Sequence, residues 1–67
     1  MIFAYAMTRV GEAQHAVRIQ ENGHAERKTL CGRKVATAYS AGSIEPGKPI
    51  QHPWRCDTCS RKVEAAA

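Results

Sequence analysis

Cys56-Asp57-Thr58-Cys59 places two cysteines at the C-x2-C spacing, at which two thiolates on one tight turn bind a single metal ion. The same spacing occurs in thioredoxin-like redox pairs, but these need a βαβ unit larger than this chain can form. Three unrelated buried thiols are a further alternative. Metal binding is favoured because Cys31 supplies a third thiolate. The adjacent Gly32 permits a sharp turn that directs amide hydrogens at this sulfur.

A tetrahedral zinc site needs a fourth ligand, which is expected to be a histidine, with Asp57 as an alternative. In AQHAVRIQ (residues 13–20), His15 shares one face with apolar side chains, which predicts a strand, and the following Asn22-Gly23 predicts a hairpin turn. Opposed residues in that hairpin have numbers that add up to about 45 or 46, so His15 lies level with Leu30 or Cys31. We therefore expect His15 to be the fourth ligand.

His24 and His52 are the alternatives to His15. His24 lies at the tip of the predicted hairpin, roughly 23 Å from Cys31 along an extended strand at about 3.3 Å per residue. It reaches the metal only if the hairpin does not form. His52 is close in sequence to Cys56, where the C-x2-C pair already supplies two ligands.

The chain is short: its 67 residues predict a single zinc-binding domain over residues 1–67. So small a domain buries little apolar surface, and a structural metal is a common remedy. The odd number of cysteines and the absence of a basic segment followed by an apolar stretch at the N-terminus predict a cytoplasmic protein with reduced thiols. No apolar run approaches the roughly 20 residues that cross a membrane, so no membrane role is expected.

The expected fold class is a small α+β zinc-stabilised domain, with zinc-ribbon-like antiparallel β-hairpins and a short C-terminal helix. Gly11 ends the first expected strand, and Pro53 interrupts the last one. Asp57 or Thr58 is expected to cap the helix. The expected strands cover residues 2–10, 13–20, 27–30, 33–39 and 50–55, with a short helix as the alternative over residues 33–39. An exposed loop is expected over residues 40–49, and the helix over residues 59–66.

The basic side chains suggest an anionic partner, because the formal net charge is +4. Part of this charge balances a Cys3His zinc site with a formal charge of −1, through Arg33, Lys34, Arg55, Arg61 and Lys62. A nucleic-acid surface on the hairpin is expected to comprise Arg18, Arg27, Lys28, Arg33 and Lys34. Tyr39 or Trp54 is available for base stacking.

His15, the run from Lys28 to Arg33 (KTLCGR) and the run from Trp54 to Cys59 (WRCDTC) together resemble the small H…TxCG…CxxC zinc-finger proteins of actinobacteria and their phages. The likeness covers about two thirds of the chain, with loose spacings between the motifs. It implies that His15 is the ligand in the upstream strand. Residues 2–7 and the Pro46-Gly47 loop lie outside the shared motif.

These observations predict a regulatory or adaptor protein with structural zinc that binds nucleic acid through its basic surface. Four protein ligands close the metal site, so no enzymatic activity and no small-molecule substrate are expected. The alternative is a protein-interaction module, including a phage-encoded one, that binds a larger host protein such as the transcription machinery by strand addition.

Overall fold

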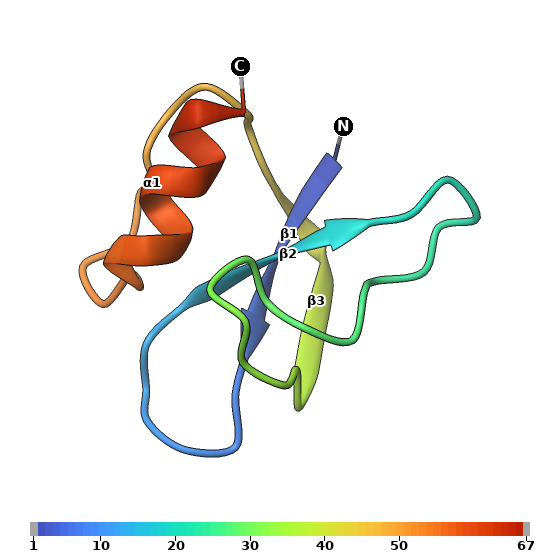
Figure 1. Ribbon diagram of the computed structural model, residues 1–67, viewed down its shortest axis with the longest axis horizontal. Helices are drawn as coiled ribbons and strands as arrows, with labels where there is room; N and C mark the ends of the chain where they lie inside the picture. Colours follow the sequence, from blue (N-terminus) through green and yellow to red (C-terminus); the bar gives the residue numbers. More distant parts are fainter. Residues whose placement is uncertain (1, 67) are drawn as a thin grey trace.

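The computed structural model describes residues 2–66, except for the side chains of residues 39–43. Its elements follow the order β1 (Ile2–Met7), β2 (His15–Ile19), β3 (Thr37–Ile44) and α1 (Asp57–Ala65). The strands form an antiparallel sheet in the order β2-β1-β3, and α1 lies beside it (Figure 1). The predicted class, a small antiparallel sheet with a C-terminal helix, is confirmed at this level. The zinc-ribbon designation stays a prediction.

β1 is the central strand, and both of its faces are covered. Phe3 is buried on the face that packs against α1, together with Ala16 and Val63. Ala4 and Ala6 alternate with Phe3 and therefore point to the opposite face, where they pack with Val17. β1 ends at Met7, so the strand predicted over residues 2–10 is too long.

β2 continues into the predicted hairpin turn, which the structure confirms. The Gly23 N–H donates to the Gln20 carbonyl at 2.9 Å, and Gly23 has a φ of +86°, a conformation that favours glycine. Ile19 is bridged to Ala25 across this turn. β2 is nevertheless buried on both faces, because Ala16 as well as Val17 is fully buried.

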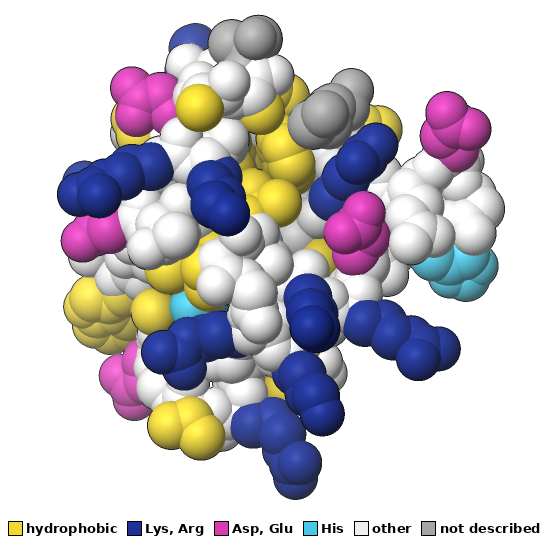
Figure 2. Space-filling view, viewed as in Figure 1, with side chains coloured by type: hydrophobic (Ala, Val, Ile, Leu, Met, Phe, Trp, Pro, Cys, Tyr) yellow, Lys and Arg dark blue, Asp and Glu magenta, His cyan; other side chains and the backbone are white. Residues whose placement is uncertain are grey.

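Beyond Glu26 the chain turns away from β2 and bonds to it again at Leu30, so the continuous strand predicted over residues 27–30 does not form. Residues 27–35 fold instead into a tight turn of their own, which we call the cysteine hairpin. The Val35 N–H donates to the Arg27 carbonyl at 2.9 Å, and Lys28 is bridged to Lys34. Lys and Arg side chains gather on the surface over this hairpin (Figure 2).

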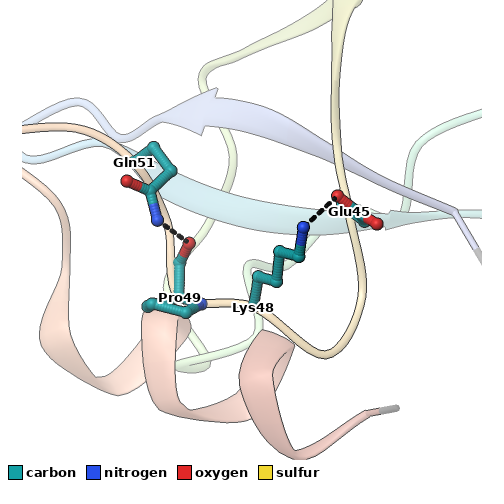
Figure 3. A network of polar contacts seen from close by, with 4 residues as sticks. All are labelled: Glu45, Lys48, Pro49 and Gln51. Atoms are coloured by element: carbon teal, nitrogen blue, oxygen red, sulfur yellow. Dashed lines mark hydrogen bonds and ion pairs between the residues drawn. The ribbon is translucent and has the colours of Figure 1, made fainter.

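The expected loop over residues 40–49 is wrong for residues 40–44, which belong to β3. Backbone pairing with β1, including Ile44 opposite Phe3, outweighs the weak strand propensity of this Gly- and Ser-containing stretch. β3 also begins only at Thr37, whereas the prediction began its strand at residue 33. The loop proper carries a Glu45–Lys48 ion pair of 3.4 Å and a hydrogen bond from Gln51 Nε2 to the Pro49 carbonyl (Figure 3).

Residues 50–55 do not form the predicted strand. Their pairing is limited to a bridge between Arg55 and Gln14. α1 begins at Asp57, earlier than predicted, and its N-cap is Cys56, which makes no side-chain capping bond. The predicted caps, Asp57 and Thr58, are therefore wrong, because both residues lie within the first turn.

Within residues 2–66 no helix has the length and apolar character needed to cross a membrane.

Candidate metal centre

Four side chains converge at one end of the sheet: His15, Cys31, Cys56 and Cys59. Their ligand atoms all lie within 4.8 Å of one another. They come from the start of β2, the turn of the cysteine hairpin and the first turn of α1. Such a group of three thiols and one imidazole can hold a metal ion. The structure thus brings together all four residues that the sequence predicted as ligands.

Two backbone bonds of the preceding residue, Gln14, to the segment before α1 hold His15 in this cluster. The Gln14 N–H donates to the Trp54 carbonyl at 2.7 Å, and the Cys56 N–H donates to the Gln14 carbonyl at 2.8 Å. His15 is only 5% exposed, and its Nδ1 lies 3.3 Å from the Cys31 Sγ and 3.7 Å from the Cys59 Sγ. Nδ1 is therefore the ring nitrogen that faces the sulfurs.

The cysteine hairpin orients Cys31 through a turn that closes on Gly32. The Gly32 N–H donates to the Thr29 carbonyl at 2.9 Å, with a φ of +92° at Gly32. This confirms the sharp turn predicted for the Cys-Gly pair. Across β2, the Leu30 N–H donates to the Ala16 carbonyl at 2.9 Å, which sets Cys31 level with His15 as the predicted register required.

Thr29 is a site residue to which sequence reasoning assigned no role. Its Oγ1 lies 3.0 Å from the Cys31 Sγ and accepts the Arg33 N–H at 3.1 Å. Because the oxygen accepts from Arg33, its own hydrogen is available to the sulfur. The signal was the threonine of the T-x-C-G motif, whose position matches that of an outer-shell donor to a thiolate ligand.

Cys56 and Cys59 lie at the start of α1. Cys56 is the N-cap, and its carbonyl accepts the Ser60 N–H at 2.9 Å, while Cys59 occupies the first turn and is fully buried. The N-terminus of a helix presents free N–H groups and the positive end of its dipole, which attract negative charge. The Ser60 hydroxyl accepts the Ile50 N–H at 3.0 Å and attaches the preceding loop to the helix.

The environment shifts the acidities of the cluster in different directions. Burial, aided by the Arg33 charge, lowers the pKa of His15 and keeps the imidazole neutral, the form that binds metal. Burial acts to raise the pKa of Cys31, but hydrogen bonds from Thr29 and other neighbours outweigh it, and that pKa is lowered. Burial raises the pKa of Cys59 to about 12. Cys31 is therefore the more acidic of these two thiols.

The alternative ligands lie outside the cluster. His24 is exposed at the hairpin tip, where its backbone N–H donates to Asn22 Oδ1 at 3.0 Å. The His52 Nδ1 accepts the Trp54 N–H at 3.1 Å, and its ring lies 6.2 Å from the Trp54 ring, centroid to centroid. Asp57 is exposed on α1 and is not among the clustered side chains.

The predicted nucleic-acid residues fall into two groups. Arg18 lies on β2 and faces Glu26 at 4.0 Å. The other four, all exposed, belong to the cysteine hairpin: Arg27, Lys28, Arg33 and Lys34. Of the two predicted stacking residues, Trp54 is 64% exposed but belongs to the segment paired with Gln14, and the side chain of Tyr39 lies outside the described part of the chain.

No protein-family model, curated protein or solved structure matches this chain.

Proposed function

We propose that this protein is a small zinc-binding adaptor of the H…TxCG…CxxC type, in which the metal stabilises the fold and a basic surface binds nucleic acid. The spacing of the four clustered donor atoms carries the metal part of the proposal. Four protein donors complete a tetrahedron, so we assign the zinc a structural role and the chain no enzymatic activity.

The donor spacing is compatible with tetrahedral zinc. With Zn–S bonds of about 2.3 Å and Zn–N bonds of about 2.05 Å, a sulfur and a nitrogen of one tetrahedron lie about 3.6 Å apart. The His15 Nδ1 lies 3.3 Å from the Cys31 Sγ and 3.7 Å from the Cys59 Sγ, one distance below this value and one above it. A donor set rich in cysteine favours zinc over calcium or magnesium, which prefer oxygen ligands.

The small core explains why the fold needs a metal. The largest fully buried side chains are Ile50, Val17, Val63 and Cys59, and much of the remaining core is alanine. Cys59 thus belongs to both the core and the cluster. Because unfolded chains lack a preformed site, metal binding adds directly to folding free energy.

Native mass spectrometry of the purified protein tests this role. The expected result is one Zn²⁺ per chain, with loss of the folded circular-dichroism spectrum when a chelator removes it. A protein that carries no metal, or that keeps its melting temperature in chelator, would contradict structural zinc.

The nucleic-acid part of the proposal is supported by the exposed basic side chains of the cysteine hairpin. Clustered Lys and Arg side chains are typical of surfaces that bind the phosphate backbone of nucleic acids. Such binding weakens steeply as the salt concentration rises. Fluorescence anisotropy with mixed-sequence DNA and RNA oligonucleotides at low salt is the direct test. Absence of binding by the zinc-loaded protein would refute this part and leave the zinc assignment intact.

A protein partner is the second candidate, and the sheet edge is the observation that favours it. The outer side of β2 already receives bonds from Glu26 and Leu30, whereas no strand in the described part of the chain pairs with the outer edge of β3. β3 contains no charged residue in its eight positions, Thr37–Ile44, and charge is a usual protection of an exposed edge. Salt-resistant association of the zinc-loaded protein with itself or with a protein partner would favour this candidate.

A further inference from the structure

The strongest unexplained feature outside the metal centre is a pair of like charges on the cysteine hairpin. Lys28 and Lys34 are bridged directly opposite each other in antiparallel register. Like charges at opposed positions lower the stability of a strand pair. The ion pairs found among the described residues involve Arg18 and Lys48, and neither lysine of this pair takes part in them.

Lys34 also lines two surface hollows. The smaller hollow, of about 220 Å³, is lined by Arg9, Arg33 and Lys34 together with Thr8 and Val10. No acidic side chain lines it. The Thr8 hydroxyl already donates to the Val10 carbonyl at 2.8 Å, so the three cationic side chains supply the free donors. Their charge and donor groups match a phosphate.

The larger hollow has a volume of about 540 Å³. Arg27, Lys28 and Lys34 line it with the apolar side chains of Ala25 and Val35. Ala25 and Val35 also pack against the Ala4 and Ala6 face of the sheet, which gives this hollow a fixed base. Glu26, the one acidic residue in its wall, faces Arg18.

We propose that the two hollows form one binding track for single-stranded nucleic acid, with Lys34 at its centre. The track comprises Arg9, Arg27, Lys28, Arg33 and Lys34. A phosphate occupies the smaller hollow, and an unstacked base packs against Val35 and Ala25 in the larger one. A single strand fits this arrangement because its bases are free to leave the stack, whereas duplex bases are paired and stacked inside the helix.

This inference rests on the nucleic-acid part of the proposed function and adds Arg9, which comes from the loop after β1. It also explains why Lys28 and Lys34 lie opposite each other, because a bound phosphate backbone neutralises both charges and removes their repulsion. Single-stranded DNA and RNA share the phosphates and bases that the track recognises. Binding measurements with each of them show which one the protein prefers.

Fluorescence anisotropy of the zinc-loaded protein tests the track, with fluorescein-labelled oligothymidylate and oligouridylate about 12 nucleotides long and a matched duplex. We expect tighter binding to the single strands. Each phosphate that the track contacts should add about −0.7 to the salt slope, so three such contacts correspond to about 20-fold weaker binding between about 50 and 200 mM salt.

Matched variants locate the surface. Arg9→Ala and Lys34→Ala should each weaken binding roughly 3- to 10-fold and reduce the salt slope by about 0.7. Lys48→Ala and Lys48→Gln remove a positive charge from an exposed position in the loop after β3 and should have little effect. Zinc content and circular dichroism establish that each variant is folded.

The outcomes separate the inference from the function on which it rests. No binding by the unaltered protein at low salt would refute both. Binding that falls equally in all four variants would refute the track and leave a diffuse electrostatic role. Tighter binding to the duplex would refute the single-strand assignment, and a difference between oligothymidylate and oligouridylate would identify the preferred sugar.

Discussion

Replacing Thr29 by valine isolates the outer-shell hydrogen bond to the metal centre. Valine has nearly the shape of threonine but no hydroxyl, and Thr29 is only 4% exposed, so the packing should change little. Two interactions disappear: the 3.0 Å contact with the Cys31 Sγ and the 3.1 Å bond from the Arg33 N–H. Both serve the turn that orients Cys31.

The first of these interactions determines the expected loss of zinc affinity. A hydrogen bond to a charged acceptor contributes about 1.5–3 kcal/mol. Outer-shell substitutions typically weaken metal binding about 10- to 100-fold, a similar free energy. Loss of the bond to the Arg33 N–H should lower the stability of the metal-free fold by a further ~1 kcal/mol. We therefore expect zinc binding at least about tenfold weaker in Thr29→Val.

Competition with a chromogenic zinc chelator measures this change. Thr29→Ser restores the hydroxyl and should recover most of the affinity, whereas a purely steric role of the methyl group would not be rescued. Thr58→Val makes the same substitution at an exposed position between Cys56 and Cys59 and should bind zinc normally. Affinity of Thr29→Val within about twofold of the unaltered protein would refute an outer-shell role for Thr29.

Three further predictions follow from the cluster and the core. His15→Ala should lose zinc while His24→Ala retains it, as native mass spectrometry would show; the reverse would place the ligand at the hairpin tip. Zinc affinity should rise with pH, because the Cys59 thiol, with its pKa raised to about 12, must release a proton to bind the metal. Chelator competition at several pH values measures this, and affinity independent of pH would contradict it. Val63→Ala, at a fully buried position, should lower the free energy of unfolding by about 2 kcal/mol in denaturant titrations of the zinc-loaded protein; a change within experimental error would contradict its core role.

The candidate site was predictable from the sequence because its determinants are local. The Asn22-Gly23 turn predicts the pairing that brings His15 level with Cys31 and thereby favours His15 over the other histidines. C-x2-C and Cys-Gly are likewise short patterns with a direct geometric meaning. What the sequence could not show was the contact between Thr29 and the Cys31 sulfur, which depends on how tightly the cysteine hairpin closes.

The parts of the fold that differ from prediction depend on partners distant in sequence. Residues 40–44 have the composition of a loop and become strand because β1 offers them a free edge. Conversely, residues 27–30 are expected from the sequence to continue along β2, yet the chain turns away after Glu26 and returns at Leu30, because the bond from Val35 to Arg27 closes a separate hairpin. The early start of α1 at Asp57 places Cys59 in its first turn, beside His15, which propensity alone does not specify.

The position of β1 has a consequence for synthesis on the ribosome. β1 lies between β2 and β3 in the sheet but is translated before both of them. In the candidate metal centre, the contact between His15 and Cys59 joins residues 44 positions apart in the sequence. Contacts so distant in sequence close slowly relative to local ones. The face of β1 that packs against α1 therefore stays uncovered until α1 has left the exit tunnel, and only then are all four side chains of the candidate metal centre present.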